Sequence, residues 1–190
     1  MLPRKMNSIV DKNLLLEHLL NDITDEDRRL RFGYIATDEA VTQYFEKSLK
    51  QLGKTDMWFI IDDGYKVISS CHVYYCEETN TAEMGCTVSP EYRNKKLGQE
   101  LFNRGVTWAR MRGAENIFMQ CLSENKIIQH IAKKNNMTVV TIGRGEKEAT
   151  IKVKRNPMSS LFEDSMMETI AVYDSAIRKQ RWFFKQFMRL

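Results

Sequence analysis

Residues 88–101 read Val-Ser-Pro-Glu-Tyr-Arg-Asn-Lys-Lys-Leu-Gly-Gln-Glu-Leu, and this stretch carries the strongest structural signal in the chain. Apolar residues alternate before it, as in a strand, and recur at helical spacing after it. It therefore predicts a strand, a basic loop and a helix that begins at or just before Gly98. The first N–H groups of a helix have no partners within it and form an anion site with the helix dipole. With Arg93, Lys95 and Lys96 beside it, this site suits a pyrophosphate; a solvated basic turn is the alternative.

The segments around this loop predict an α/β fold with a mixed sheet. Periodicity and turn residues divide the rest of the chain into helical and extended segments. We expect helices over 13–20, from Thr24, and over 38–52; strands over 57–61, 66–76 and 81–88; a helix from the loop to Gly113; a strand over 116–122; a helix capped by Ser123; a hairpin of 137–142 and 148–153 around Gly143-Arg144-Gly145; and a helix after Pro157.

The bulk composition fits one domain, expected over residues 1–156, with a helical extension over residues 157–190. A hydrophobic fraction of 43% in 190 residues is enough for a buried core. No apolar run is long enough to span a membrane and no secretory signal is recognisable, so we expect a cytoplasmic protein. The four cysteines and three histidines lack metal-ligand spacing, so no metal site is expected. The net charge of +4 is too small to predict nucleic-acid binding.

The run Arg93-Asn94-Lys95-Lys96-Leu97-Gly98 resembles the Q/R-x-x-G-x-G/A pyrophosphate loop of the GNAT superfamily of N-acetyltransferases. The flanking strand and helix, and an Arg28–Phe32 segment similar to one found in bacterial members, extend the resemblance over about residues 12 to 155. It implies a mostly antiparallel central sheet flanked by helices, with the tail as an extra helix. It also implies acetyl-CoA as co-substrate, held by the loop residues Arg93, Asn94, Lys95, Lys96, Leu97, Gly98 and Gln99.

Three departures from the family pattern affect this interpretation. Lys96 stands where members usually carry the first glycine of the loop, and Ala132 stands where many carry a tyrosine that protonates the departing thiolate. The N-terminal strand common in the family is expected to be short or missing. The general acid is therefore undefined by the sequence.

Within the strand 81–88, Glu83, Gly85 and Thr87 point away from the apolar face. Glu83 is the candidate general base that removes a proton from the amine, and a solvent-facing strand acid is the alternative. The resemblance implies that the pantetheine arm pairs with freed backbone near Thr87 and Val88. Asn125 either contacts the cofactor arm or only caps its helix, and His130 is expected to be a helix residue without a catalytic role.

The expected function is acetyl transfer from acetyl-CoA to a primary amine, on a small molecule or a protein. Two other classes stay open: a non-catalytic acetyl-CoA-binding module, favoured by Ala132, and a nucleic-acid-associated protein, favoured only by the basic tail. Tyr173, Ile177, Phe184 and Met188 fall near one stripe of that tail, with Trp182, Phe183 and Phe187 beside it. The stripe predicts packing on the domain or on a second subunit, so a homodimer is also left open; a basic-aromatic arm for nucleic acid or another anionic surface is the alternative.

Overall fold

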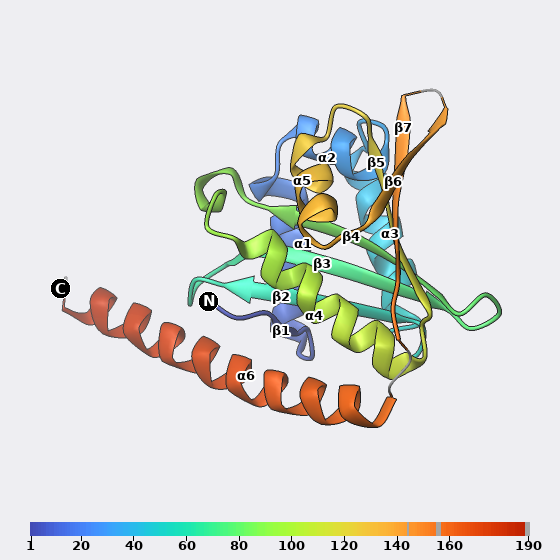
Figure 1. Cartoon of the computed structure of the whole chain (residues 1–190). Helices are drawn as coiled ribbons and strands as arrows, with labels where there is room; N and C mark the ends of the chain where they lie inside the picture. The colour runs from blue at the N-terminus through green and yellow to red at the C-terminus, as the bar shows by residue number, and fades with distance from the viewer. Residues whose placement is uncertain (144, 155–156, 189–190) are drawn as a thin grey trace.

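The computed structural model describes residues 1–143, 145–154 and 157–188. Arg144 of the expected turn, Asn156 at the expected domain end, and Arg189 and Leu190 of the tail lie outside these ranges. The described chain forms a seven-stranded sheet in the order β1-β2-β3-β4-β5-β7-β6, in which only β4 and β5 are parallel neighbours (Figure 1). The strands are β1 (Arg4–Lys5), β2 (Asp56–Asp62), β3 (Val67–Cys76), β4 (Thr81–Val88), β5 (Asn116–Leu122), β6 (Thr138–Gly143) and β7 (Glu146–Lys152).

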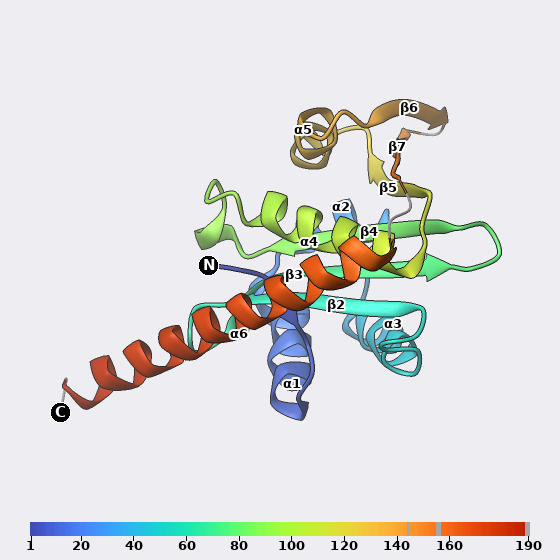
Figure 2. The same ribbon diagram turned by 60° about the horizontal axis from the view of Figure 1, so that its bottom comes forward.

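Helices cover both faces of this sheet. Figure 2 shows α1 and α3 on one face of β2 and β3, and α4 on the other. The helices are α1 (Ile9–Glu17), continued by the π-helical turn η1 (His18–Asp22), then α2 (Asp25–Phe32), α3 (Asp38–Leu49), the 3₁₀ turn η2 (Pro90–Tyr92), α4 (Leu97–Arg112), α5 (Lys126–Lys134) and α6 (Pro157–Phe187). The predicted mixed, mostly antiparallel sheet flanked by helices, with an extra C-terminal helix, is confirmed, and β1 is short as expected.

Local chemistry explains where the helices begin and end. Ser8 accepts a hydrogen bond from the Asp11 amide, so α1 begins at Ile9, earlier than the sequence suggested. Gly113 ends α4 with a left-handed backbone, as predicted. The predicted Ser123 cap of α5 is wrong, because Asn125 is the residue that accepts from the Ile128 amide.

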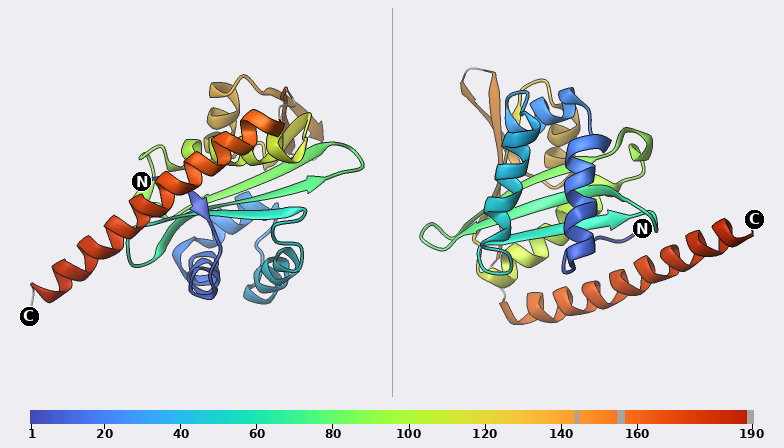
Figure 3. Two further views of the ribbon diagram at one scale, coloured as in Figure 1. Left: turned by 90° about the horizontal axis from the view of Figure 1, so that it is seen from below. Right: turned by 180° about the vertical axis from the view of Figure 1, so that it is seen from behind.

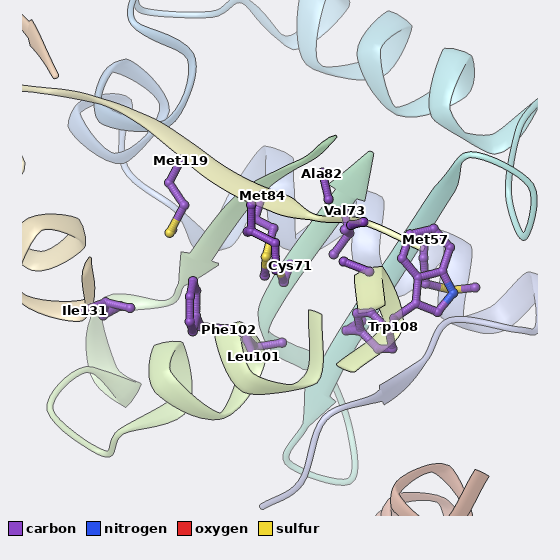
Figure 4. Packing of buried hydrophobic residues seen from close by; sticks show 14 of the residues in the cluster. Met57, Cys71, Val73, Ala82, Met84, Leu101, Phe102, Trp108, Met119 and Ile131 are labelled. Carbon is purple, nitrogen blue, oxygen red and sulfur yellow. The ribbon is translucent and has the colours of Figure 1, made fainter. Parts of the chain in front are cut away.

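Two hydrophobic clusters hold the layers together, one on each face of the sheet. The α1–α3 side buries Leu15, Val41 and Phe45 against Trp58 of β2. On the α4 side, Leu101, Phe102 and Trp108 pack with core residues that include Met84, and Figure 4 shows them meeting beneath the strands. Because Ala82 and Met84 of β4 belong to the cluster on the α4 side, the side chains of this strand have defined directions at the site described below.

The last helix, α6, packs against α4 and β1, and its C-terminal half projects beyond the rest of the molecule (Figures 1 and 3). The contact is polar: Arg104 of α4 pairs with Asp164 and Glu168, while Arg4 of β1 donates to Ser175. None of the helices in the described part of the chain combines the length and apolar character that a membrane span requires.

Candidate active site

The sheet opens in its middle, between β4 and β5. The two strands pair only at Thr81–Asn116, Ala82–Ile117 and Glu83–Phe118, although β4 continues to Val88 along β3. The other edge of β5 pairs with β7 along the whole strand, Asn116–Leu122. The edge of β4 that faces β5 is therefore free of strand pairing from Met84 onward.

Ladder geometry identifies which backbone groups face this opening. In an antiparallel pair, alternate residues direct their N–H and C=O groups to opposite edges. The amide of Ser89, which follows β4, donates to the Ile68 carbonyl of β3, so Thr87 and Gly85 also bond toward β3. Met84, Cys86 and Val88 consequently direct their backbone groups into the opening. Thr87, predicted as a backbone contact for the cofactor, faces β3 instead, and its hydroxyl lies 2.9 Å from Nε2 of His18.

A cavity of about 640 Å³ extends from the opening. It is bounded by the end of β4, the loop after it, and the starts of α4 and α5. Of the cofactor-binding residues predicted from sequence, the cavity lining includes Thr87, Val88, Arg93, Asn94, Lys96, Leu97, Gly98, Gln99 and Asn125. Lys95 instead places its ammonium 4.5 Å from the ring centroid of Tyr92.

The loop backbone is shaped to hold an anion. Asn94 and Lys96 both adopt left-handed conformations, with φ of 62° and 63°. The first helical hydrogen bonds of α4 come from Gln99 and Glu100 to the Lys96 carbonyl, so the amides of Leu97 and Gly98 precede them. Successive amides in such a turn form a concave anion-binding surface, strengthened here by the helix dipole. A pyrophosphate-sized group fits this chemistry.

Several lining side chains also have partners within the protein. The Arg93 guanidinium forms an ion pair with Asp27 of α2, and Gln99 donates a hydrogen bond at 2.9 Å to Asn135, the residue that follows α5. Gly98 lies so close to α5 that a Cβ there would be 3.0 Å from Cδ1 of Ile131. The glycine thus serves helix packing, and the access to backbone that the sequence suggested for it stays a prediction.

A second cavity, of about 770 Å³, lies on the face of β4 that carries Glu83 and Gly85. Arg31 of α2 lines both cavities, and its guanidinium lies across Gly85. A Cβ on Gly85 would be 1.9 Å from the Arg31 guanidinium carbon, so only glycine leaves room for this contact. Glu83, two residues away on the same strand face, attracts the guanidinium electrostatically.

A directed chain of hydrogen bonds leads from Arg31 into the sheet. Its Nη2 donates to the Tyr44 hydroxyl at 2.9 Å, and that hydroxyl lies 2.6 Å from Nδ1 of His72. The carboxylate of Asp56 accepts from Nε2 of His72 at 2.8 Å, which fixes the tautomer of the neutral ring. Nδ1 of this ring therefore accepts a hydrogen bond from the Tyr44 hydroxyl. Arg31 is thereby held at the junction of the two cavities.

The ionisation of this chain follows from its burial and its charges. Burial lowers the pKa of His72, and Asp56 opposes this only in part, so the ring is neutral at pH 7. Burial also opposes the charge on Arg31, but Tyr44 and Glu83 outweigh it and raise the pKa of Arg31. A permanent cation therefore lies beside the Glu83 carboxylate.

The family emerges from comparison with known proteins. The sequence matches the acetyltransferase (GNAT) family over residues 18–136, which is more than half of the chain. The chain belongs to the GNAT family. Family membership makes it an acyltransferase, and no curated protein matches the sequence closely enough to indicate the acceptor.

Solved GNAT structures share the fold. The GNAT domain of S. lividans PAT superposes with a TM-score of 0.65 at 14% identity, covering 80% of this chain and 89% of that one. Spermidine N-acetyltransferase from Vibrio cholerae, in complex with CoA and spermine, gives 0.62 at 16% identity over 80% and 95%. A putative acetyltransferase from Salmonella typhimurium with its cofactor acetyl-CoA gives 0.61 at 14% over 81% and 94%.

Two features of this GNAT site differ from the expectations. Ala132 stands where the tyrosine that protonates the thiolate is found in many members, which implied a position facing the thioester; it is instead fully buried in the core on the α4 side and lines neither cavity. The pairing of Arg31 with Gly85 was not predicted. The only sequence signals for it were a glycine inside a strand, which often marks a close approach, and the arginine-rich segment before Phe32.

Proposed function

We propose that the chain transfers the acetyl group of acetyl-CoA to a primary amine. The observation that carries this proposal is the meeting of two cavities at the opening of β4, with Arg31 lining both of them and Glu83 lining the second. Backbone groups of Cys86 and Val88 would hold the pantetheine arm, and the amides of Leu97 and Gly98 the pyrophosphate. Bound acetyl-CoA supplies the activated acetyl thioester.

The chain's own residues supply proton removal and charge stabilisation. A protonated amine has no lone pair for attack, so Glu83 acts as general base from the second cavity, directly or through one water. Arg31 provides a fixed cation in a partly buried place, where electrostatic stabilisation of developing negative charge is strongest. Tyr44 and His72 act as positioning residues that hold the guanidinium.

The second cavity favours a cationic acceptor. The carboxylates of Glu83 and Glu146 lie among its lining residues, where they attract an ammonium group before it is deprotonated. Arg31 and Lys47 in the same cavity favour an acceptor that also carries a polar or anionic group. We therefore place amines with a second polar function ahead of simple alkylamines.

The test is release of free coenzyme A from acetyl-CoA in the presence of an amine panel. The panel contains polyamines, aminoglycoside-like amines, amino acids and lysine-bearing peptides, and calorimetry measures acetyl-CoA binding in parallel. We expect binding together with turnover for at least one amine. Tight binding without acetylation of any amine or protein extract would instead support a non-catalytic binding module.

A further inference from the structure

The outermost helix of the molecule carries its apolar face toward solvent. The face of α6 that contacts α4 and β1 buries small and charged residues, such as Ser160, Asp164, Ala171 and Ser175. The opposite face forms what we call the α6 seam, which consists of Phe162, Met166, Ile170, Tyr173, Ile177, Phe184 and Phe187. Each of these side chains exposes between 49% and 69% of its surface. The predicted stripe therefore does not pack on the domain, apart from Trp182, which stacks on Tyr65.

The spacing of the seam is that of helix pairing. From Met166 to Phe187 its members recur at intervals of four and three residues, with Gln180 at one intervening position. Such an alternation keeps one narrow stripe in register with a neighbouring helix over several turns. A patch for a flat surface would not need this periodicity.

The acidic and the basic residues of α6 lie in different halves of the helix. Residues 157–174 contain four acids and no lysine or arginine, whereas residues 175–187 contain four basic residues and no acid. The acids are Glu163, Asp164, Glu168 and Asp174, and the basic residues are Arg178, Lys179, Arg181 and Lys185. Asp164, Glu168, Asp174 and Arg178 already form ion pairs within the chain, so the orientation is argued from Glu163, Lys179, Arg181 and Lys185. Two antiparallel copies would place Glu163 of one near the basic residues of the other, whereas two parallel copies would bring the basic residues together.

We propose that α6 pairs in antiparallel fashion with α6 of a second copy of this chain. With the two helices fully overlapped, Met166 of one copy lies opposite Ile177 of the other, and Ile170 lies opposite Tyr173. The same register places Glu163 near Arg181 of the other copy. The arrangement is self-complementary, as a two-fold symmetric interface must be.

The apolar area that the seam offers is large enough for an interface with a second copy. A stable interface buries roughly 800 Å² on each side. An aromatic side chain buries about 150–250 Å² when fully covered. The four in the seam still expose between 56% and 69% of their surface, and Met166, Ile170 and Ile177 add to this area. An anionic membrane is disfavoured, because the seam continues through the acidic half of the helix. This inference does not depend on the proposed acetyl transfer.

The first test measures the mass of the full-length chain in solution by sedimentation or light scattering. We expect a dimer at micromolar concentration. Ile177→Glu should weaken it at least tenfold, while Gln186→Glu, which adds the same carboxylate at an exposed position off the seam, should leave it intact. A monomeric parent chain, or a dimer insensitive to Ile177→Glu, would overturn the proposal. The full chain is required because truncation would strip Arg104 of its buried partners.

The second test addresses orientation by charge reversal. Arg181→Glu should weaken the dimer, and adding Glu163→Arg should restore it, because the reversed pair is again complementary. Circular dichroism and thermal unfolding confirm that each variant is folded. Failure of the double variant to recover dimerisation would overturn the antiparallel arrangement. Binding of the parent chain to anionic phosphatidylserine vesicles as a monomer would identify a membrane as the partner and overturn the proposal as a whole.

Discussion

The guanidinium of Arg31 occupies the space that any side chain on Gly85 would need, with 1.9 Å between its central carbon and an ideal Cβ on the glycine. A methyl group there must displace Arg31 from the junction of the two cavities. We expect Gly85→Ala to lower turnover by at least roughly tenfold, because a positioned cation is lost. Turnover at saturating acetyl-CoA measures the effect.

A double-mutant cycle shows whether the two residues act together. Gly85→Ala should cost little further activity in an Arg31→Ala background, where no guanidinium remains to be displaced. Equal losses in both backgrounds would mean that Gly85 serves another purpose, such as direct access for a substrate.

The Glu83→Gln variant tests whether Glu83 is the general base. The change keeps the size of the side chain and removes its ability to accept a proton, so turnover should fall at least roughly tenfold at neutral pH while acetyl-CoA affinity stays nearly constant. The exposed Glu39 of α3 provides the control, since Glu39→Gln removes an equal charge at a residue that lines neither cavity. An unchanged rate from pH 6 to 9, roughly the range in which a base matters, would remove Glu83 from the mechanism.

Substitutions of Lys96 test whether the loop before α4 binds the pyrophosphate of acetyl-CoA. Its left-handed backbone costs a non-glycine residue roughly 1–2 kcal/mol, so Lys96→Gly should stabilise the fold by about 1 kcal/mol. Acetyl-CoA affinity should change by only a few fold, because the amides of the loop remain. Lys96→Glu keeps the strain and reverses the charge, and should weaken binding at least roughly tenfold. Equal affinities of these two variants would place the pyrophosphate elsewhere.

His18 makes the fold sensitive to acid. Burial lowers its pKa to about 4, so below its unfolded value of 6.5 the unfolded chain binds a proton that the folded chain excludes. Stability is therefore complete above pH 6.5 and falls as pH decreases toward 4, by about 2 kcal/mol at pH 5. Burial of His72 adds to this loss. Urea unfolding should show a smaller loss in His18→Gln and an unchanged loss in His130→Gln, which removes an exposed ring.

Ala132→Tyr distinguishes a core position from an active-site position. The alanine is fully buried, so a tyrosine must displace neighbouring core side chains and should destabilise the chain by about 1–3 kcal/mol or more. A variant of unchanged melting temperature and higher turnover would show that this helix face reaches the acyl site after all.

Local patterns in the sequence were sufficient to predict the order of the helices and strands and the position of the basic loop. Alternation placed β4, the basic run placed the start of α4, and Gly113 marked its end. The errors lie where a residue's meaning depends on distant contacts. Periodicity could not show that Arg31 meets Gly85, or that Ala132 faces the core. The tail pattern correctly indicated an apolar stripe on the C-terminal helix, but the charged residues that dock α6 gave no sign of their partners.

The polar contact of α6 also sets an order of events during synthesis. Arg4 is buried against Ser175, which is 171 residues later in the chain. At roughly 5–20 residues per second, that partner is made on the order of ten to thirty seconds after Arg4. Until then the N-terminal strand holds a guanidinium whose native surroundings are incomplete. The nascent chain can assemble its central sheet early, but the edge formed by β1 is closed only after α6 has been made.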